Sequence, residues 1–273
     1  MLNNLPVETQ QKWANLLEIL QSMDHVLVAL SGGVDSSLLC VAAKNALGDQ
    51  SAAITIASQV EVPGETDFAR SVAQQVDIRH FIVAWDDLSI PAFAANDPMR
   101  CYYCKLNRLG YAVTFAREND LGVVVDGSNV DDAQDYRPGR KALQELGIRS
   151  PLAEAGLTKS DIRRLAQTLS LTVWDRPSAP CLATRFPYGT PITETGLHQV
   201  AEAEIFLKDL GFKIFRVRHH GEIARIEVAQ QEINSLIEQR IKVVDKLKSL
   251  GFHYVSLDLE GYRTGSMNEV IKQ

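Results

Sequence analysis

The fold is decided by the stretch Ser31-Gly32-Gly33-Val34-Asp35-Ser36-Ser37. It follows the apolar run 26–30 and precedes the apolar run 38–43, a pattern that predicts a strand, a glycine turn and a helix start. Such a turn leaves backbone N–H groups unpaired at the helix N-terminus, where the helix dipole favours anions. The glycines let a phosphate approach the backbone, the serines add hydroxyl donors, and the aspartate can hold a metal ion or a ribose. The alternative is a serine-rich N-cap on a core helix.

Composition and charge place the chain among globular proteins. Its 273 residues suffice for one large domain or two modest ones, and 45% hydrophobic with 23% charged residues is ordinary for such a protein. No apolar run approaches the ~20 residues that cross a bilayer, and residues 1–13 are too polar for a signal peptide, so we expect a cytoplasmic protein with no membrane partner. The net charge of −6 argues against a nucleic-acid partner.

Strand-like and helix-like segments alternate in the first part of the chain. We expect strands at 26–30, 52–57, 79–84 and 122–126, and helices at 8–23, 37–47, 64–76, 99–118 and 158–170. This alternation predicts an α/β fold with a parallel sheet, whose ligand lies beyond the carboxyl ends of the strands. Asp126 follows one strand as the glycine turn follows another, so it is a candidate cofactor ligand, although Asp126-Gly127-Ser128-Asn129 also fits a simple turn.

Two further segments carry local signals. The helix at 158–170 begins with Thr158-Lys159-Ser160-Asp161, which resembles a capping box. The loop 128–140 is polar and is either a mobile lid or a solvated connection.

A proline-rich loop at 174–192 separates two arrangements of elements. After it we expect helix 194–210, strands 212–218 and 223–228 in an antiparallel hairpin, helix 231–249 and strand 253–259. The sequence therefore predicts a parallel α/β domain over residues 1–175 and a smaller α+β domain over residues 176–273.

The four cysteines of a protein in a reducing compartment are thiols or metal ligands rather than a disulfide framework. Cys101 and Cys104 lie on one face of the helix at 99–118, which fits zinc, an iron–sulfur cluster, a redox pair or two packed thiols. Cys181 lies in the proline-rich loop, and Cys40 lies in an apolar helix where we expect a buried, inert thiol. Structural zinc needs four ligands, whereas a cluster held by three cysteines leaves one iron open for a ligand such as sulfide.

Paired arginines predict an anion site in the second domain. Arg216 and Arg218 alternate along a strand and so project to the same face, and paired guanidiniums suit a phosphate or carboxylate. We expect them to hold a substrate phosphate together with Arg185, while Glu227 orients the substrate ring or the arginines. The alternative is a row of arginines that face solvent.

The motifs together resemble the LarE family, the ATP-dependent sulfur transferases that complete the nickel-pincer nucleotide of lactate racemase. The likeness covers nearly the whole chain and rests on SGGVDSS at 31–37, GSNVDD at 127–132, RPSAPCLATR at 176–185, RVRHHG at 216–221 and LDLEGYRTGSMNE at 257–269. The first motif alone is similar to the pyrophosphate loop of many ATP pyrophosphatases. The combination is specific to the LarE family.

The resemblance implies a two-step reaction that uses ATP and Mg²⁺. ATP would adenylate a carboxylate of pyridinium-3,5-biscarboxylic acid mononucleotide and release pyrophosphate, and a protein-held sulfur would then displace AMP. In family members with one cysteine, the residue that corresponds to Cys181 is consumed as the sulfur donor. This chain also carries Cys101 and Cys104, and so is similar to the branch in which three cysteines hold a 4Fe–4S cluster that binds sulfide. The resemblance also implies a homo-oligomer, and it leaves the source of sulfide open.

Three other functions fit parts of the sequence. A tRNA thiolase also joins a pyrophosphate loop to three cysteines, but it needs a broad basic surface that a net charge of −6 does not favour. An ammonia-using synthetase would leave Cys101, Cys104 and Cys181 without a role. A nucleotide sensor without catalysis would not need the full phosphate loop, and an assay of pyrophosphate release distinguishes it from an enzyme.

Overall fold

A computed structural model describes residues 2, 5–134, 139–177, 179–263 and 265–268. The chain forms two compact units, of which the first comprises residues 1–58, 64–85 and 101–179 and the second comprises residues 59–63, 86–100 and 180–273. The chain therefore passes between the units several times. A domain boundary after residue 175, in the sense of two independently folding parts, remains a prediction.

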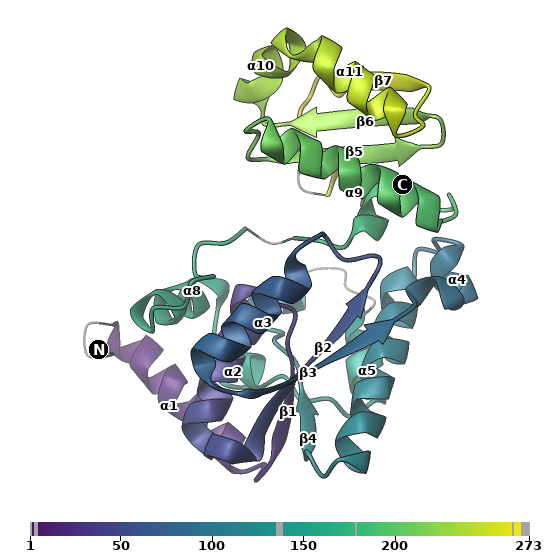
Figure 1. Ribbon diagram of the computed structural model, residues 1–273. Coiled ribbons are helices and arrows are strands. Elements are labelled where there is room, and N and C mark those ends of the chain that lie inside the picture. The colour runs from purple at the N-terminus through teal and green to yellow at the C-terminus, as the bar shows by residue number, and fades with distance from the viewer. Residues whose placement is uncertain (1, 3–4, 135–138, 178, 264, 269–273) are drawn as a thin grey trace. The chain divides into compact units, whose positions relative to one another are not determined.

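The sheet of the first unit is parallel throughout and has the strand order β3-β2-β1-β4 (Figure 1). Its strands are β1 (Val26–Ala29), β2 (Ser51–Ser58), β3 (Arg79–Trp85) and β4 (Val123–Val125). The α/β fold and these four strands confirm the prediction from the sequence. Because β1 and β4 are parallel neighbours, the segments that follow them lie at the same edge of the sheet.

The helices of the first unit are α1 (Val7–Gln21), α2 (Val34–Leu47), α3 (Glu65–Val76), α5 (Arg100–Glu118), α6 (Gly139–Glu145), α7 (Pro151–Glu154) and α8 (Lys159–Thr168). The short helices α6 and α7 were not expected from the sequence. The predicted start of α2 at residue 37 was wrong by three residues. Val34 is already buried one turn before Leu38, and Gly33 is the N-cap, so the helix begins directly at the glycine turn.

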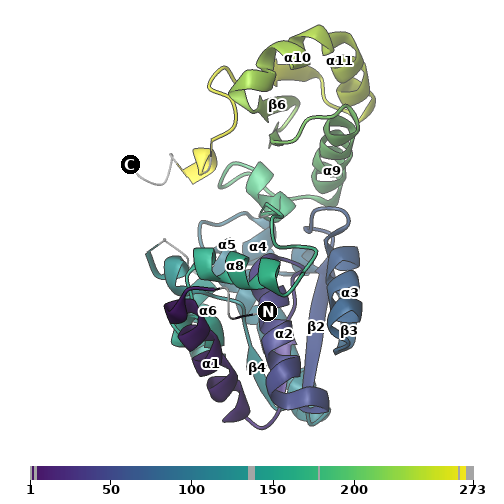
Figure 2. The same ribbon diagram turned by 90° about the vertical axis from the view of Figure 1, so that its left-hand side faces the viewer.

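Helices cover both faces of this sheet. Val26 and Val28 of β1 are buried in a core with α1, α2 and α8, whereas Leu27 is buried in a core with α5, because successive strand residues point to opposite faces. Figure 1 shows α5 on one side of the sheet and α1, α2 and α8 on the other. Figure 2 shows α8 beside α2, the helix that begins at the glycine turn.

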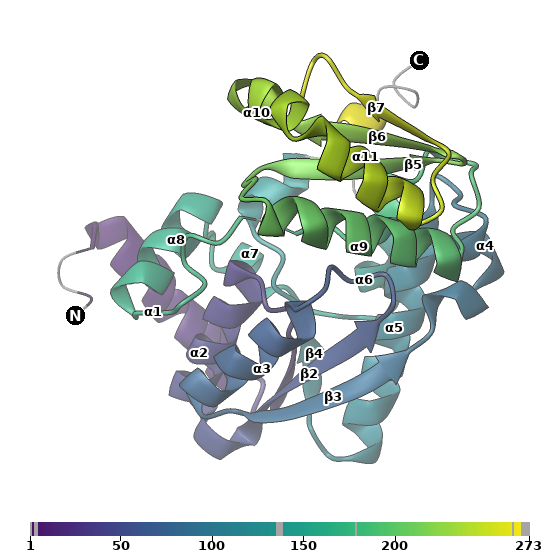
Figure 3. The same cartoon turned by 45° about the horizontal axis from the view of Figure 1, so that its top comes forward.

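The second unit contains a three-stranded sheet with the order β5-β6-β7. Strands β5 (Phe215–His220) and β6 (Ile223–Val228) are antiparallel, and β7 (Tyr254–Leu257) is parallel to β6. Its helices are α4 (Pro91–Ala94), α9 (Glu194–Asp209), α10 (Ile233–Glu238) and α11 (Arg240–Ser249). Figure 3 shows α9 and α11 together along one face of this sheet.

Two boundaries in the second unit differ from the prediction. The strand expected at 212–218 begins at Phe215 and continues to His220, where Gly221 turns the hairpin with a φ of +64°. The helix expected at 231–249 is divided at Gln239 into α10 and α11, and no glycine or proline marks that break in the sequence.

Two further expectations concern the loop and the membrane. In the loop 128–140 the described part is a 3₁₀ turn at Val130–Gln134 and the start of α6, and residues 135–138, on which a lid would depend, lie outside the described residues. In the part of the chain that the structure describes, no helix combines the length and the apolar character needed to span a membrane.

Candidate active site

The glycine turn forms an open N-terminus for α2. Gly32 has a φ of +78°, and Gly33, the N-cap, is extended and gives the helix no side-chain cap. The hydroxyls of Ser36 and Ser37 donate to the carbonyl oxygen of Gly33 at 3.2 and 2.8 Å, and the backbone N–H of Ser31 donates to Ser36 Oγ at 3.2 Å. These hydroxyls therefore shape the turn. The first N–H groups of α2, which a cap would otherwise bind, can accept an anion.

Two glycines permit close backbone contacts at this turn. A Cβ on Gly32 would lie 3.0 Å from backbone atoms of both Glu65 and Ala69 in α3. A Cβ on Gly127 would lie 2.9 Å from the backbone nitrogen of Ser36. The segment after β4 thus packs directly on the first turn of α2, and this brings Asp126 to the phosphate loop.

Asp126 is buried and held by several donors. Its carboxylate accepts hydrogen bonds from the hydroxyl of Ser128 at 2.7 Å and the hydroxyl of Ser150 at 2.6 Å. Lys105 Nζ lies 3.5 Å from Asp126 Oδ2 and brings a positive charge from α5 to the ends of the strands. A fixed carboxylate and a lysine at this edge suit a nucleotide or its metal ion.

The Cys-x-x-Cys pair lies at the same edge of the first unit. Ala112 of α5 is buried in the core against the sheet, and Cys101 precedes it on the same helix face by about three turns. Lys105, one turn after Cys101, reaches Asp126, and Arg108 donates to the carbonyl oxygen of Ile56 in β2 at 3.1 Å. The first turns of α5 therefore extend past the sheet toward the phosphate loop. Cys101 is exposed and Cys104 is partly exposed.

Arg176 connects the segment before Cys181 to the phosphate loop. Its guanidinium forms an ion pair with Glu65, stacks 3.6 Å from the ring centre of Phe68, and lies 3.4 Å from the carbonyl oxygen of Gly32. The first residue of the RPSAPCLATR motif is thus part of the wall of the phosphate site.

The predicted arginine pair forms a cluster on the hairpin of the second unit. In the register of β5 and β6, Arg216 lies opposite Glu227 and Arg218 opposite Arg225. Glu227 is fully buried and binds Arg218 at 2.6 Å and Arg225 at 3.1 Å. Ser266 donates to the same carboxylate at 3.2 Å. One buried carboxylate therefore orders two guanidiniums beside it.

Arg216 is the member of this cluster that can bind an anion. Its side chain is partly buried, and its guanidinium lies 5.2 Å from the ring centre of Tyr262. Burial lowers the pKa of Arg216, and the neighbouring positive charge of Arg185 lowers it further. A phosphate would offset both effects, because it supplies negative charge next to two closely spaced cations.

Arg185 holds the turn that contains Cys181. Its guanidinium is buried and forms two hydrogen bonds with Glu204, at 2.9 and 2.7 Å. It also donates to the carbonyl oxygens of Pro180 and Cys181 at 2.8 and 3.3 Å. Arg185 thus fixes the backbone around Cys181, whose side chain is partly exposed. A direct contact of Arg185 with substrate remains a prediction.

The cysteines are distributed over both units. Cys101 and Cys104 belong to the first unit and Cys181 to the second. Among the described residues, no three His, Cys, Asp or Glu side chains are grouped as a metal site. Cys40 is fully buried as predicted, and burial raises the pKa of its thiol, so it is a poor ligand for a metal.

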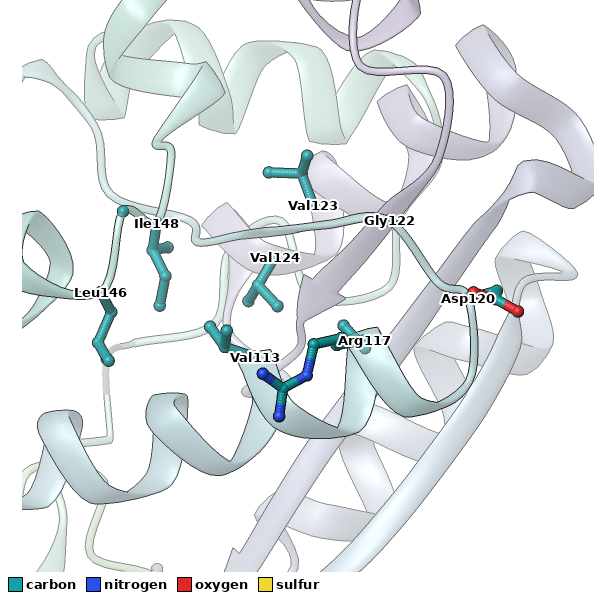
Figure 4. A pocket seen from close by; sticks show the side chains of 10 residues that line it. Val113, Arg117, Asp120, Gly122, Val123, Val124, Leu146 and Ile148 are labelled. Atoms are coloured by element: carbon teal, nitrogen blue, oxygen red, sulfur yellow. The ribbon is translucent and has the colours of Figure 1, made fainter.

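A cavity of about 400 Å³ lies at the opposite end of the first unit's sheet. Figure 4 shows Val113, Val124 and Ile148 around it, with Arg117 and Asp120 also in its lining. It opens beside the start of β4 and the end of α5, whereas the phosphate loop follows the ends of the strands. The cavity is therefore not part of the candidate site.

Several residues of the site were not expected from the sequence. Glu204 could have been found, because it interrupts the apolar spacing of Leu197, Val200 and Leu207 on the buried face of α9. Lys105 and Lys159, which reach Asp126 and Asp35, carry no such signal, because lysines on helices usually face solvent.

Comparisons with known proteins agree with this geometry. Residues 18–94 match the asparagine synthase family. The pyridinium-3,5-bisthiocarboxylic acid mononucleotide synthase of Lactiplantibacillus plantarum is 40% identical over 261 residues, which are 95% of each chain. A protein of Synechocystis sp., described as uncharacterized, is 40% identical over 96% of this chain and 98% of its own. A glutamine-hydrolyzing GMP synthase chain of Methanoculleus marisnigri is 43% identical over 163 residues, which are 54% of this chain and 51% of its own length.

The match to the GMP synthase covers about half of this chain, whereas the match to the Lactiplantibacillus synthase continues through the arginine cluster and the second unit. Because that match covers nearly all of both chains, the protein belongs to the LarE family within the PP-loop ATP pyrophosphatases, and it is an ATP-dependent sulfurtransferase.

Proposed function

We propose that the protein converts pyridinium-3,5-biscarboxylic acid mononucleotide into the bisthiocarboxylic acid mononucleotide, a step in the biosynthesis of the nickel-pincer nucleotide. The observation that carries this proposal is the 40% identity to the Lactiplantibacillus synthase over 95% of both chains. The phosphate loop in the first unit and the arginine cluster in the second supply the two phosphate sites that such a reaction needs.

The first half-reaction is adenylation. A carboxylate oxygen of the substrate attacks the α-phosphorus of ATP, the bond to the leaving pyrophosphate breaks, and an acyl adenylate forms. The uncapped N–H groups of α2 bind the phosphates and stabilise the charge that develops on pyrophosphate. Asp35, in the first turn of α2, would hold the Mg²⁺ that neutralises phosphate charge. Asp126 would contact the nucleotide from the neighbouring strand.

The arginine cluster binds the phosphate of the mononucleotide. Arg216 contacts the phosphate, and Arg218 with Arg185 provides positive charge beside it. Glu227 orients Arg218 and Arg225, since it binds both guanidiniums while fully buried. The donor set suits a dianion because guanidinium groups bind phosphate oxygens in pairs.

The second half-reaction transfers sulfur. A sulfide attacks the acyl carbon, the bond to AMP breaks, and a thiocarboxylate forms. We propose that Cys101, Cys104 and Cys181 hold a 4Fe–4S cluster, which supplies an iron with an open position for sulfide. All three thiols are at least partly exposed, unlike the buried Cys40, and each lies close in sequence to a point where the chain passes between the units. The alternative is that Cys181 itself donates the sulfur.

The reaction can be tested with protein purified without oxygen and supplied with ATP, Mg²⁺, the mononucleotide and sulfide. We expect release of AMP and pyrophosphate, and a mass gain of the mononucleotide that corresponds to exchange of oxygen for sulfur. Asp35→Ala should slow pyrophosphate release by about a hundredfold or more, as loss of transition-state charge stabilisation does in other enzymes. The control Asp49→Ala removes the exposed carboxylate of another lysine–aspartate pair and should not change the rate. A native rate in Asp35→Ala would contradict the assignment of the phosphate site.

The cluster has a separate test in the absorption spectrum. Cysteine-ligated clusters absorb broadly at roughly 400 nm, so the anaerobic protein should show this band and Cys101→Ala, Cys104→Ala and Cys181→Ala should each lose it. Cys40→Ala is the matched control, because it removes the buried cysteine and should keep the band. Iron-loaded protein that keeps the band in all three variants would rule out these ligands.

A further inference from the structure

An ion pair beside the phosphate loop has no role in the reaction as described above. Lys159 Nζ donates to the carboxylate of Asp35, and the two side chains are 36% and 25% exposed. Asp35 lies in the first turn of α2, directly after the two glycines of the turn. A lysine ammonium is therefore held at the N-terminus that the phosphates of a nucleotide would approach.

The backbone of Lys159 is fixed although its side chain is partly exposed. Lys159 is the first residue of α8, whose N-cap Thr158 forms a complete capping box with Asp161. The N–H of Lys159 donates to Asp131 at 2.8 Å. Ile162 and Leu165 are fully buried in the core that α8 shares with α2. The helix thus presents the lysine to the phosphate loop from a rigid base.

Stability alone does not account for the pair. Ion pairs with this much exposure contribute little to folding free energy, because water screens the charges and two long side chains lose freedom. Helix α8 is already anchored through Asp161, which accepts hydrogen bonds from Thr9 at 2.8 Å and Lys12 at 3.1 Å. The pair does, however, occupy two groups, a cation and a carboxylate, that a magnesium–nucleotide complex would use separately.

We propose that Lys159 binds the β- or γ-phosphate of ATP and that it leaves Asp35 when the nucleotide enters. The ammonium then pairs with a phosphate oxygen, and the carboxylate of Asp35 becomes available to the magnesium ion. No covalent bond changes, and the exchange conserves charge pairing, since each group loses one partner and gains another. The ammonium also stabilises the charge that collects on the departing pyrophosphate. This inference rests on the proposed ATP site.

The test compares ligands with and without the β- and γ-phosphates. Wild type and Lys159→Met are titrated calorimetrically with α,β-methylene-ATP plus Mg²⁺, and separately with AMP. Loss of one charge-assisted contact should weaken binding of the ATP analogue by about tenfold or more, whereas AMP affinity should change less than about twofold. Lys159→Arg keeps the charge and should recover part of the affinity.

Lys12→Met is the matched control, because Lys12 also pairs with an aspartate of the first unit but lies on α1. It should leave the affinity for the ATP analogue unchanged, and thermal unfolding confirms that each variant is folded. Equal affinity of wild type and Lys159→Met for the analogue would overturn the inference and leave the ATP site standing. An equal loss for AMP would overturn it as well. A wild-type protein that binds neither ligand would remove the proposed function and the inference together.

Discussion

Gly127 is a residue whose lack of a side chain has a direct consequence for the phosphate site. A Cβ at this position would lie 2.9 Å from the backbone nitrogen of Ser36, which cannot move without displacing the first turn of α2. Gly127→Ala should therefore cost on the order of 1–3 kcal/mol of stability and weaken ATP binding. Urea unfolding and titration with the ATP analogue measure the two effects.

The control for this substitution is Gly110→Ala. Gly110 lies within α5, and a Cβ there would meet only the Leu146 side chain, at 3.7 Å. Alanine is a better helix former than glycine, so this variant should be as stable as wild type or more stable by up to about 1 kcal/mol. If Gly127→Ala behaves like Gly110→Ala, the close approach at Ser36 does not constrain the site.

Arg216 offers the cleanest test of substrate binding by the arginine cluster. Arg218 is bound to a buried carboxylate, so its removal would leave Glu227 under-compensated and destabilise the protein. Arg216→Ala should weaken mononucleotide binding by about tenfold or more, through loss of a charge-assisted hydrogen bond, and leave ATP affinity unchanged. Arg240→Ala, which removes an exposed arginine of the same unit, should change neither affinity. An equal loss of both affinities in Arg216→Ala would mean that the arginine is structural.

Single residues were predictable where their function depends on local sequence. The glycine turn is recognisable from two glycines between a strand and a helix, and Arg216 and Arg218 are recognisable from strand alternation. The pairing of Asp35 with Lys159 could not be predicted, because the two residues lie 124 positions apart in sequence. The internal use of the Ser36 and Ser37 hydroxyls depends on how tightly the turn closes, which residue types alone do not specify.

Among the elements, α8 is the one whose start was specified most fully by its sequence. Thr158 and Asp161 form both hydrogen bonds of the predicted capping box. Asp161 also joins α8 to α1, because Thr9 and Lys12 donate to it. By contrast, the break at Gln239 between α10 and α11 and the late start of β5 at Phe215 lack glycine or proline signals, so periodicity alone placed these boundaries wrongly.

The carboxylate of Asp161 should make stability depend on pH. Burial raises its pKa, but hydrogen bonds from Thr158, Thr9 and Lys12 outweigh burial and lower the pKa from 3.8 to about 2. A carboxylate with a lowered pKa stabilises the folded state fully above its ordinary pKa, and this stabilisation is lost as pH falls toward 2. The contribution at neutral pH is on the order of 2 kcal/mol.

Asp161→Asn should accordingly reduce the free energy of unfolding by about 1–2 kcal/mol at pH 7. The difference between wild type and variant should narrow as pH falls from 5 to about 3, which urea unfolding at several pH values can measure. Asp49→Asn changes a 99% exposed side chain and should follow wild type throughout. A constant difference across this range would show that Asp161 acts through shape and not through its charge.

At the scale of the whole molecule, the chain crosses repeatedly between two units, and the cysteines lie near those crossings. Cys101 directly follows residue 100, where the chain leaves the second unit, and Cys181 directly follows Pro180, where it enters that unit again. The sequence predicted two parts from the proline-rich segment, but it could not predict that residues 59–63 and 86–100 belong with the second. Those segments have no composition that distinguishes them, and their assignment depends on long-range packing.

The distribution of cysteines leads to a prediction about the source of sulfur. If Cys181 is the donor, each protein molecule delivers one sulfur and its mass falls by one sulfur atom after turnover, whereas Cys101→Ala and Cys104→Ala remain competent for that single turnover. If the three cysteines hold a cluster, added sulfide supports many turnovers, all three alanine variants lose them, and the mass at Cys181 does not change. We expect the second pattern, because this chain keeps two further accessible thiols on α5 beside the phosphate loop, where Lys105 of the same turn reaches Asp126. Mass spectrometry of iron-loaded protein before and after turnover decides between the two, and loss of sulfur at Cys181 in step with product would assign the donor to that residue alone.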